Sequence, residues 1–473
     1  MNLLFVCLSD LHLGEEDSIL TNLSLGEPVP EPRGPGPCML ALVNYFHGIK
    51  SYLNQGKAIP FLILNGDILE LATSTYPISS TYFRLFLTEL AKRELFDRYI
   101  YLPGNHDHGL WSLIRDTQFV ESLSRQSGSP AHLQVEHVTQ LSIPRPSPLL
   151  TLLASNLPMG TISPMLFVAN PVFRLQSWRG HDFLFHHGHL LEDIYKLLSM
   201  LRDRVMKDIT FDDLKKKALR ERLGELEKEN WPWIDFVWSG FARAGRVGHT
   251  VEAIYELLST PEGMKKLIGR LGDVLRMEFD VPGVPEGLED NLFRFILKKA
   301  LQKGGVGSDE RADRDKPPFS EELKNMTQRF IRHYMNRELA DEGLRPAMDR
   351  TCFIFGHTHK PFLNELQDDQ SGFGKIAAVN SGGWVIESDT YWPNHAPGIV
   401  IGSNAGDVAL VKYTLDKKPG SKIETQGNWD NTLDGLSENQ ELANAVAKAV
   451  AVRRPYFKER VKKTKKILES LST

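Results

Sequence analysis

Five short polar clusters in the sequence carry aspartate, asparagine and histidine side chains that can bind metal ions. They are Asp10-Leu11-His12, Gly66-Asp67, Gly104-Asn105-His106-Asp107, His187-Gly188 and Gly356-His357-Thr358-His359. Carboxylate and imidazole groups suit Mn, Fe, Zn, Ni or Co, and one carboxylate can bridge two ions about 3.5 to 4 Å apart. Asp67 is the natural bridge. These residue types therefore predict a centre that holds two divalent metal ions.

Such a centre would attract phosphate. Two divalent cations carry four positive charges, whereas the carboxylates of Asp10 and Asp67 carry two negative charges. The site therefore keeps a net positive charge. The same charge lowers the pKa of bridging water. The predicted chemistry is therefore hydrolysis at phosphorus.

Each cluster directly follows a short apolar run that reads as a buried strand. These runs are Leu3 to Leu8, Pro60 to Leu64, Tyr99 to Leu102, Phe183 to Phe185 and Cys352 to Phe355. In open α/β sheets ligands bind just outside the carboxyl ends of the strands, so we expect the five clusters to converge. Glycines beside the ligands, such as Gly66 and Gly104, permit sharp turns and close backbone approach.

The rest of the pattern predicts an α/β layered core. Helix-compatible stretches run from Leu40 to Leu53 and from Tyr82 to Phe96, between the predicted strands. Further strands are expected at Ile376 to Val379, Gly398 to Ile401 and Val408 to Leu415.

Composition excludes several classes of protein. The 473 residues are 41% hydrophobic and 25% charged with a formal net charge of -4, which excludes global disorder and a chain-wide field that selects nucleic acid. The three cysteines, Cys7, Cys38 and Cys352, show no CxxC spacing and predict a reducing, cytoplasmic location. No apolar run is long enough to predict a transmembrane segment.

Between about residues 190 and 345 the apolar residues recur at the spacing of an α-helix. One stripe comprises Leu190, Ile194, Leu197, Leu201 and Val205. Helices are also predicted from Thr210 to Asn230, from Thr260 onward and from Ser320 to Asp341, ending near Gly343, with a mobile loop at 304–318. We expect this insert to be a lid that selects the substrate.

The tail is predicted to be helical and basic. Pro455 should kink or break it, and Lys and Arg dominate residues 453–466. Such a charge cluster could contact anionic lipid or nucleic acid, or form a solvated helix face. The expected division of the chain is 1–189 and 346–436 for the two parts of the catalytic core, 190–345 for the helical insert and 437–473 for the tail.

Together the five clusters resemble the calcineurin-like metallophosphoesterase family, over about residues 1 to 190 and 345 to 415. The resemblance implies an α/β fold, a β-sandwich flanked by helices, here with a large α-helical insertion. It also implies hydrolysis of a phosphomonoester or phosphodiester by attack of metal-bound hydroxide. Matched residue by residue to this sequence, the family pattern implies two sets of metal ligands. One metal would be bound by Asp10, His12, Asp67 and His359, and the other by Asp67, Asn105, His187 and His357. Mn²⁺ is the first ion that we expect, with Fe, Zn, Ni or Co as alternatives.

The family pattern assigns a catalytic role to His106, which would stabilise the phosphoryl oxygens and protonate the leaving alkoxide. Family members often carry aspartate three residues beyond the bridging aspartate, and here Glu70 holds that position. Glu70 either orients His106 or is a solvated loop carboxylate. We expect His186 to face away from the site, because successive strand residues alternate faces.

The remaining histidines carry no prediction of chemistry. His189 either supports the site or faces solvent. His108, His132, His137 and His181 are treated as ordinary histidines.

Several strings resemble the branch of UDP-2,3-diacylglucosamine hydrolases. They are Asp10-Leu11-His12-Leu13, Gly66-Asp67-Ile68-Leu69-Glu70, His187-Gly188-His189, Gly356-His357-Thr358-His359-Lys360-Pro361 and Asn380-Ser381-Gly382-Gly383-Trp384. That branch commonly has arginine in place of His106, and its members are much shorter. The alternatives are therefore a phosphatase or phosphodiesterase, a nuclease, a pyrophosphate hydrolase of that branch, or a non-enzymatic scaffold, which the intact ligand set disfavours.

An aromatic group in the insert allows two interpretations. Trp231, Trp233, Phe236, Trp238 and Phe241 precede Arg243 and Arg246. Aromatic and basic side chains together are typical of lipid-contacting segments. We favour the alternative that the aromatic residues form a small core that docks the insert on the main domain.

Overall fold

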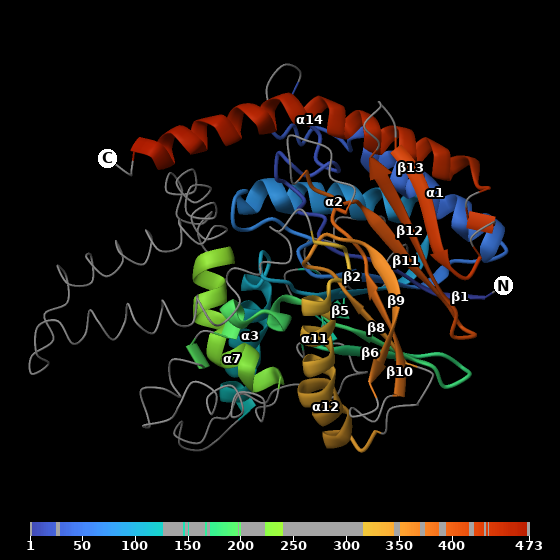
Figure 1. Ribbon diagram of the computed structural model, residues 1–473, viewed down its shortest axis with the longest axis vertical. Helices are drawn as coiled ribbons and strands as arrows, with labels where there is room; N and C mark the ends of the chain where they lie inside the picture. The colour runs from blue at the N-terminus through green and yellow to red at the C-terminus, as the bar shows by residue number, and fades with distance from the viewer. Residues whose placement is uncertain are drawn as a thin grey trace, which may run out of the picture.

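The computed structural model describes residues 2–24, 29–125, 145–146, 150, 166–167, 171–196, 198–199, 223–239, 316–344, 351–368, 374–386, 394–415, 421–429, 432–433 and 435–470. The strands of these residues form two sheets that helices flank (Figure 1). The predicted fold class, a β-sandwich flanked by helices, is confirmed.

The larger sheet has the strand order β13-β12-β11-β1-β2-β3-β5-β4. Its strands are β1 (Leu3–Leu8), β2 (Ile59–Asn65), β3 (Phe96–Leu102), β4 (Arg145–Pro146), β5 (Leu166–Phe167), β11 (Gly398–Ser403), β12 (Val408–Leu415) and β13 (Ser421–Gly427). The central strands β1, β2 and β3 run parallel, so their carboxyl ends meet at one edge.

The second sheet has the order β6-β7-β8-β10-β9. Its strands are β6 (Phe173–Gln176), β7 (Asp182–Phe185), β8 (Thr351–Phe355), β9 (Phe362–Asp368) and β10 (Gly374–Asn380). β7 and β8 are parallel neighbours although more than 160 residues of sequence separate them. The polar clusters that follow these two strands are therefore brought to the same end of the sheet.

Alternation along the strands explains the layers. In β1 the side chains of Val6 and Leu8 lie in the core beneath the helices, whereas Phe5 and Cys7 lie in the core between the two sheets. Successive strand residues point to opposite faces, so a strand that is apolar throughout must be covered on both sides. β1 is buried at every position, as this requires.

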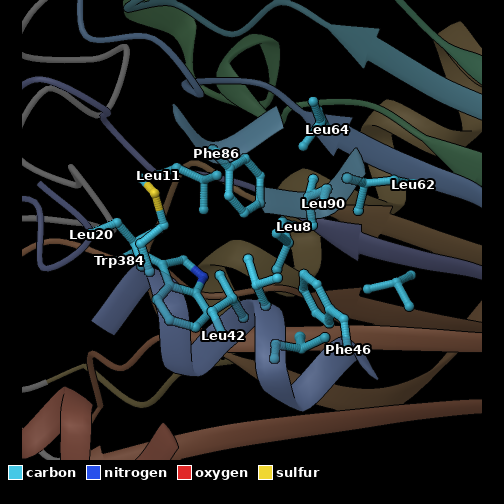
Figure 2. Close-up of a cluster of buried hydrophobic side chains, with 14 of the residues drawn as sticks. Leu8, Leu11, Leu20, Leu42, Phe46, Leu62, Leu64, Phe86, Leu90 and Trp384 are labelled. Atoms are coloured by element: carbon cyan, nitrogen blue, oxygen red, sulfur yellow. The ribbon is translucent and has the colours of Figure 1, made fainter. Parts of the chain in front are cut away.

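The helices α1 (Pro37–Leu53), α2 (Tyr76–Lys92) and α14 (Ser437–Ser470) cover the outer face of the larger sheet (Figure 1). Figure 2 shows Phe46 of α1 and Phe86 of α2 close to Leu8 of β1 and Leu62 of β2. Full burial of one such side chain stabilises the fold by about 1.5 to 3 kcal/mol.

The outer face of the second sheet carries α11 (Glu321–Phe330), the π-helical turn Ile331–Met335, α12 (Asn336–Asp341) and α7 (Leu223–Ile234). Phe330 stacks on Phe353 of β8 in the core of this layer. α3 (Gly109–Arg125) follows the loop after β3.

The helix predicted over Ser320 to Asp341 is confirmed. The Ser320 side chain accepts a hydrogen bond from the Leu323 amide at 3.0 Å, which caps the helix. Gly343 just beyond its end has a φ of 70°, a left-handed conformation that glycine adopts at no steric cost.

Four expected helix boundaries were wrong. The helix predicted over Leu40 to Leu53 begins at Pro37. The helix predicted over Tyr82 to Phe96 begins at Tyr76 and ends at Lys92, because Glu94 takes a positive φ of 48° and Phe96 pairs with Ile59 as the first residue of β3. The helix predicted to end at Asn230 continues through Pro232 to Ile234.

α14 also continues through Pro455, where a kink or break was expected. Arg453 donates to the backbone carbonyl of Glu16 at 3.0 Å and also to that of Thr21. These tertiary contacts hold this part of α14 against the core and offset the amide hydrogen bond that proline cannot make.

Other parts of the insert differ from the sequence pattern or lie outside the described residues. The start of the Leu190 stripe forms two short 3-10 helices, His189–Leu191 and Asp193–Lys196, and Leu197, Leu201 and Val205 lie outside the described residues. The Thr210 start, the Thr260 helix and most of the 304–318 loop also lie outside them. Among the described residues, we find no helix with the length and hydropathy that crossing a membrane requires.

Candidate metal centre

The loops that follow β1, β2, β3, β7 and β8 meet at one end of the two sheets. Backbone hydrogen bonds join the first two loops, because the Asp10 amide donates to the Gly66 carbonyl at 3.0 Å and the His12 amide donates to the Asp67 carbonyl at 2.9 Å. The convergence that the strand ends predict is therefore present.

The backbone at this point is strained. Positive φ angles occur at Asp10 (53°), His12 (45°), Asp67 (52°), His357 (68°) and His359 (57°). Such conformations cost of order 1 to 3 kcal/mol for residues other than glycine, and they cluster at functional sites. Five strained residues at one place indicate that the fold tolerates this free-energy cost in order to hold these side chains in position.

Two glycines allow the close approach. A Cβ on Gly66 would lie 2.2 Å from His187 Nδ1, and a Cβ on Gly104 would lie 2.2 Å from Asp67 Oδ1. Real Cβ atoms do not approach other atoms this closely. Any larger residue at either position would displace the side chains of the centre.

Asp67 lies between histidines from two loops. Its Oδ2 is 3.9 Å from His12 Nε2 and 3.2 Å from His187 Nε2, and His187 Nε2 is 3.1 Å from Asn105 Oδ1. Asp10 Oδ1 lies 3.1 Å from His359 Nε2. All these side chains are buried.

His357 completes the group. One ligand atom each from Asp67, His187 and His357 lie within 4.8 Å of one another, and the same holds for Asp10, His12 and His359. The structure therefore brings together all seven residues predicted as metal ligands.

The orientation of the imidazole rings fits metal ions. His12 Nδ1 lies within hydrogen-bond distance of Glu70 Oε2, at 2.7 Å, and His187 Nδ1 lies 3.0 Å from the Asn65 carbonyl oxygen. The Nε2 atoms of both histidines are therefore directed towards Asp67. His12 Nε2 is buried without a hydrogen-bond partner among the described residues. Buried polar atoms are normally satisfied, and metal-binding histidines normally donate their other ring nitrogen in this way. The donor set therefore fits divalent cations.

Glu70 is not a solvated loop carboxylate. Its side chain is fully buried, and Oε2 lies 2.8 Å from His106 Nδ1 as well as 2.7 Å from His12 Nδ1. Oε1 accepts the amides of Ala72 and Thr73 at 2.7 and 2.8 Å. Burial alone would raise the pKa of Glu70, but the two histidines outweigh it and hold the pKa well below its usual range.

Asp107, the last residue of the third cluster, supports the site in a way that we did not predict. Its buried carboxylate accepts the amides of Ile68 at 2.9 Å and Gly104 at 2.5 Å, and it also accepts from the Tyr101 hydroxyl. Burial and the neighbouring charge of Asp67 raise the pKa of Asp107 to about 6. Asp107 thus fastens the loop after β3 to the loop after β2.

The other histidines divide into three groups. His186 faces away from the centre as expected, with its ring 4.8 Å from that of Phe330. His108, which was treated as an ordinary histidine, is buried and contacts Glu227. His189 was expected either to support the site or to face solvent; it is buried and also contacts Glu227, so it does not face solvent. His181 lies in a turn before β7, and His132 and His137 lie outside the described residues.

The described part of the insert forms one wall of the site. Ser239 Oγ donates to the His106 carbonyl at 3.1 Å and accepts the Gly109 amide at 3.0 Å. The Tyr195 ring lies between Trp238, in a tilted contact with centroids 4.5 Å apart, and His357, in an edge-to-face contact with centroids 5.1 Å apart. Trp238 and Trp233 belong to the core on the second sheet, which agrees with the interpretation of a docking core. The Phe236 side chain, Phe241, Arg243 and Arg246 lie outside the described residues.

Comparison with known proteins agrees with this geometry. The family model of calcineurin-like phosphoesterases matches residues 3–261, which is more than half of the chain. The chain therefore belongs to the calcineurin-like phosphoesterase family, and it is a metallophosphoesterase, a hydrolase of phosphoric esters.

A crystal structure of a dimetal phosphatase from Danio rerio (LOC 393393) is 12% identical with a TM-score of 0.31, over 90% of this chain and 99% of that chain. A likeness of this size bears on neither fold nor function. No curated protein matches the chain.

Uptake of a divalent cation by the metal-free protein should release protons and become tighter from about pH 7 to pH 9. Burial alone would lower the pKa of His187, but the charges of Asp67 and Asp10 outweigh it and raise the pKa to about 9. Below that pH the ring is protonated and must lose a proton before Nε2 can bind a cation. The affinity should rise by up to about tenfold per pH unit.

Titration calorimetry of Mn²⁺ into metal-free protein measures this effect, and buffers of different ionisation enthalpy report the protons released. An affinity that stays constant over this pH range, without proton release, would contradict the assignment.

Proposed function

We propose that the chain hydrolyses a phosphomonoester or phosphodiester at a centre of two divalent cations. The observation that carries this proposal is the position of Asp67 between His12 and His187, with both imidazole Nε2 atoms directed towards its carboxylate. Two cations bound there would lower the pKa of water and stabilise the charge that develops on the phosphoryl oxygens.

The proposed ligands are those that the sequence predicted. One cation would be held by Asp10, His12, Asp67 and His359, and the other by Asp67, Asn105, His187 and His357. Asn105 contributes an amide oxygen, 3.1 Å from His187 Nε2, so its ligand atom lies beside that of His187.

His106 is the proposed catalytic residue of the chain itself. Its amide donates to Asp67 Oδ1 at 2.7 Å, and Glu70 engages its Nδ1 at 2.8 Å. The ring is therefore fixed in orientation beside the bridging carboxylate. In this position it can stabilise a phosphoryl oxygen and give a proton to the leaving alkoxide.

Glu70 acts through His12 and His106, so it is a positioning residue. It links a proposed metal ligand and the proposed acid through one carboxylate oxygen. The ordering of both rings thus depends on a single side chain.

Three finer features remain predictions. Mn²⁺ is the expected metal, because oxygen and nitrogen donors suit it, and the cytoplasm is the expected location, because Cys7, Cys38 and Cys352 are free and buried. The third is the chain division into core 1–189 and 346–436, insert 190–345 and tail 437–473. We infer that the insert selects the substrate, since Ser239 and Tyr195 already reach the site.

Asp67→Asn should lower hydrolysis of both p-nitrophenyl phosphate and bis-p-nitrophenyl phosphate by about 10²-fold or more in excess Mn²⁺, because it removes the negative charge between the cations. The matched control is Asp97→Asn, an exposed aspartate on β3, which should retain full activity. Release of p-nitrophenolate by the two variants and the wild type measures the effect. Unchanged activity of Asp67→Asn, or no metal-dependent hydrolysis by the wild type, would contradict the proposal.

Glu70→Ala should lower kcat by about 10 to 100-fold, because His12 and His106 both lose the carboxylate that orients them. The pH dependence of kcat should shift as well, since the proton on His106 loses its acceptor. The control is Glu365→Ala, an exposed glutamate on β9. A variant with wild-type kcat and pH profile would show that Glu70 does not act through these rings.

A further inference from the structure

A second cluster of buried metal-binding side chains lies beside the proposed centre. His108 comes from the loop between β3 and α3, His189 begins the 3-10 helix after β7, and Glu227 comes from α7 of the insert. One ligand atom from each lies within 4.8 Å of the others. Their exposed fractions are 1%, 2% and 2%.

Both imidazoles face the same carboxylate oxygen. His108 Nε2 lies 2.7 Å from Glu227 Oε1, and His189 Nε2 lies 3.0 Å from Oε1 and 3.3 Å from Oε2. Ligands about 2.0 to 2.1 Å from one cation are about 2.9 to 3.4 Å apart when their angle lies between 90° and tetrahedral. The distances from the two imidazoles to Glu227 therefore lie within a few tenths of an ångström of this range, and all three ligand atoms lie within 4.8 Å of one another.

The charge of the cluster also favours a cation. Glu227 is a buried carboxylate, and in the described part of the chain no lysine or arginine forms an ion pair with it. A buried charge without compensation is costly, whereas imidazoles compensate it only if one of them carries an extra proton. A divalent cation would supply the compensation and satisfy all three donors at once.

This cluster is distinct from the proposed binuclear centre. None of its three residues belongs to the two ligand sets proposed above, and the ring of His189 lies 5.6 Å from that of His187. Two histidines and one glutamate are the protein ligands of many zinc sites that keep one position open.

We propose that His108, His189 and Glu227 bind a third divalent cation, of the zinc class, that fastens the insert to the catalytic loops. His108 is two residues from His106 and His189 is two residues from His187, so the cation joins α7 to both loops. Ser239 reinforces the same connection through the His106 carbonyl and the Gly109 amide. The insert is thereby attached at the site by a metal as well as by its apolar core.

The test is the zinc content of the full chain after saturation with Zn²⁺ and dialysis against metal-free buffer, measured by mass spectrometry of the metal. The wild type should hold about three equivalents, and Glu227→Gln should hold about one fewer. Glu225→Gln, on the same helix, is the matched control and should match the wild type. Asp67→Asn should lose zinc from the binuclear centre and keep this equivalent, so failure of one site is distinguishable from failure of the other.

His108→Gln is the second variant and should also lose about one equivalent, with circular dichroism reporting whether each variant folds. A folded Glu227→Gln that holds as much zinc as Glu225→Gln and the wild type would overturn the proposal, whatever the total zinc content of the wild type. In that case the cluster would be a hydrogen-bonded contact between the insert and the core.

Discussion

Burial of the Asp10 and Asp67 carboxylates at the junction of two sheets is the constraint on which the rest of this structure depends. Both are fully enclosed, and imidazole nitrogens and backbone amides face them. Anionic side chains stay buried only when cations or protons compensate their charge. Burial lowers the pKa of His187, but the charges of Asp67 and Asp10 outweigh it and raise the pKa to about 9, so in the metal-free protein the His187 ring holds a proton that compensates them. A phosphoester hydrolase can replace that proton with metal ions and direct their charge at the substrate.

The fold can be understood as the support for this arrangement. Parallel strands of both sheets end at one place, and the loops after them contain positive φ angles at five of the proposed metal ligands. Carboxylates that do not face the centre then fix the loops. Asp107 ties the loop after β3 to the loop after β2, Glu70 orients two histidines, and Glu227 connects the insert. The geometry of the loops at the centre is thus set by buried polar contacts between segments that are distant in sequence.

Those distant contacts mark the limit of what the sequence could predict. The strands and the ligand clusters after them follow from local apolar runs and from residue type, and the helix from Ser320 follows from its cap. Asp107 was visible in its cluster, but its role depends on amides of another loop. Glu227 stands in a charged helix without a local pattern, and only the fold brings it to His108. Pro455 was expected to kink or break its helix, but α14 continues through it, and contacts of Arg453 hold this part of the helix against the core.

Anomalous X-ray diffraction from crystals of the full chain grown with Mn²⁺ tests the central claim most directly. The account predicts two anomalous peaks about 3.5 to 4 Å apart, with the Asp67 carboxylate between them, His12 beside one peak and His187 beside the other. A single peak, no peak, or a pair of peaks that Asp67 does not bridge would contradict it.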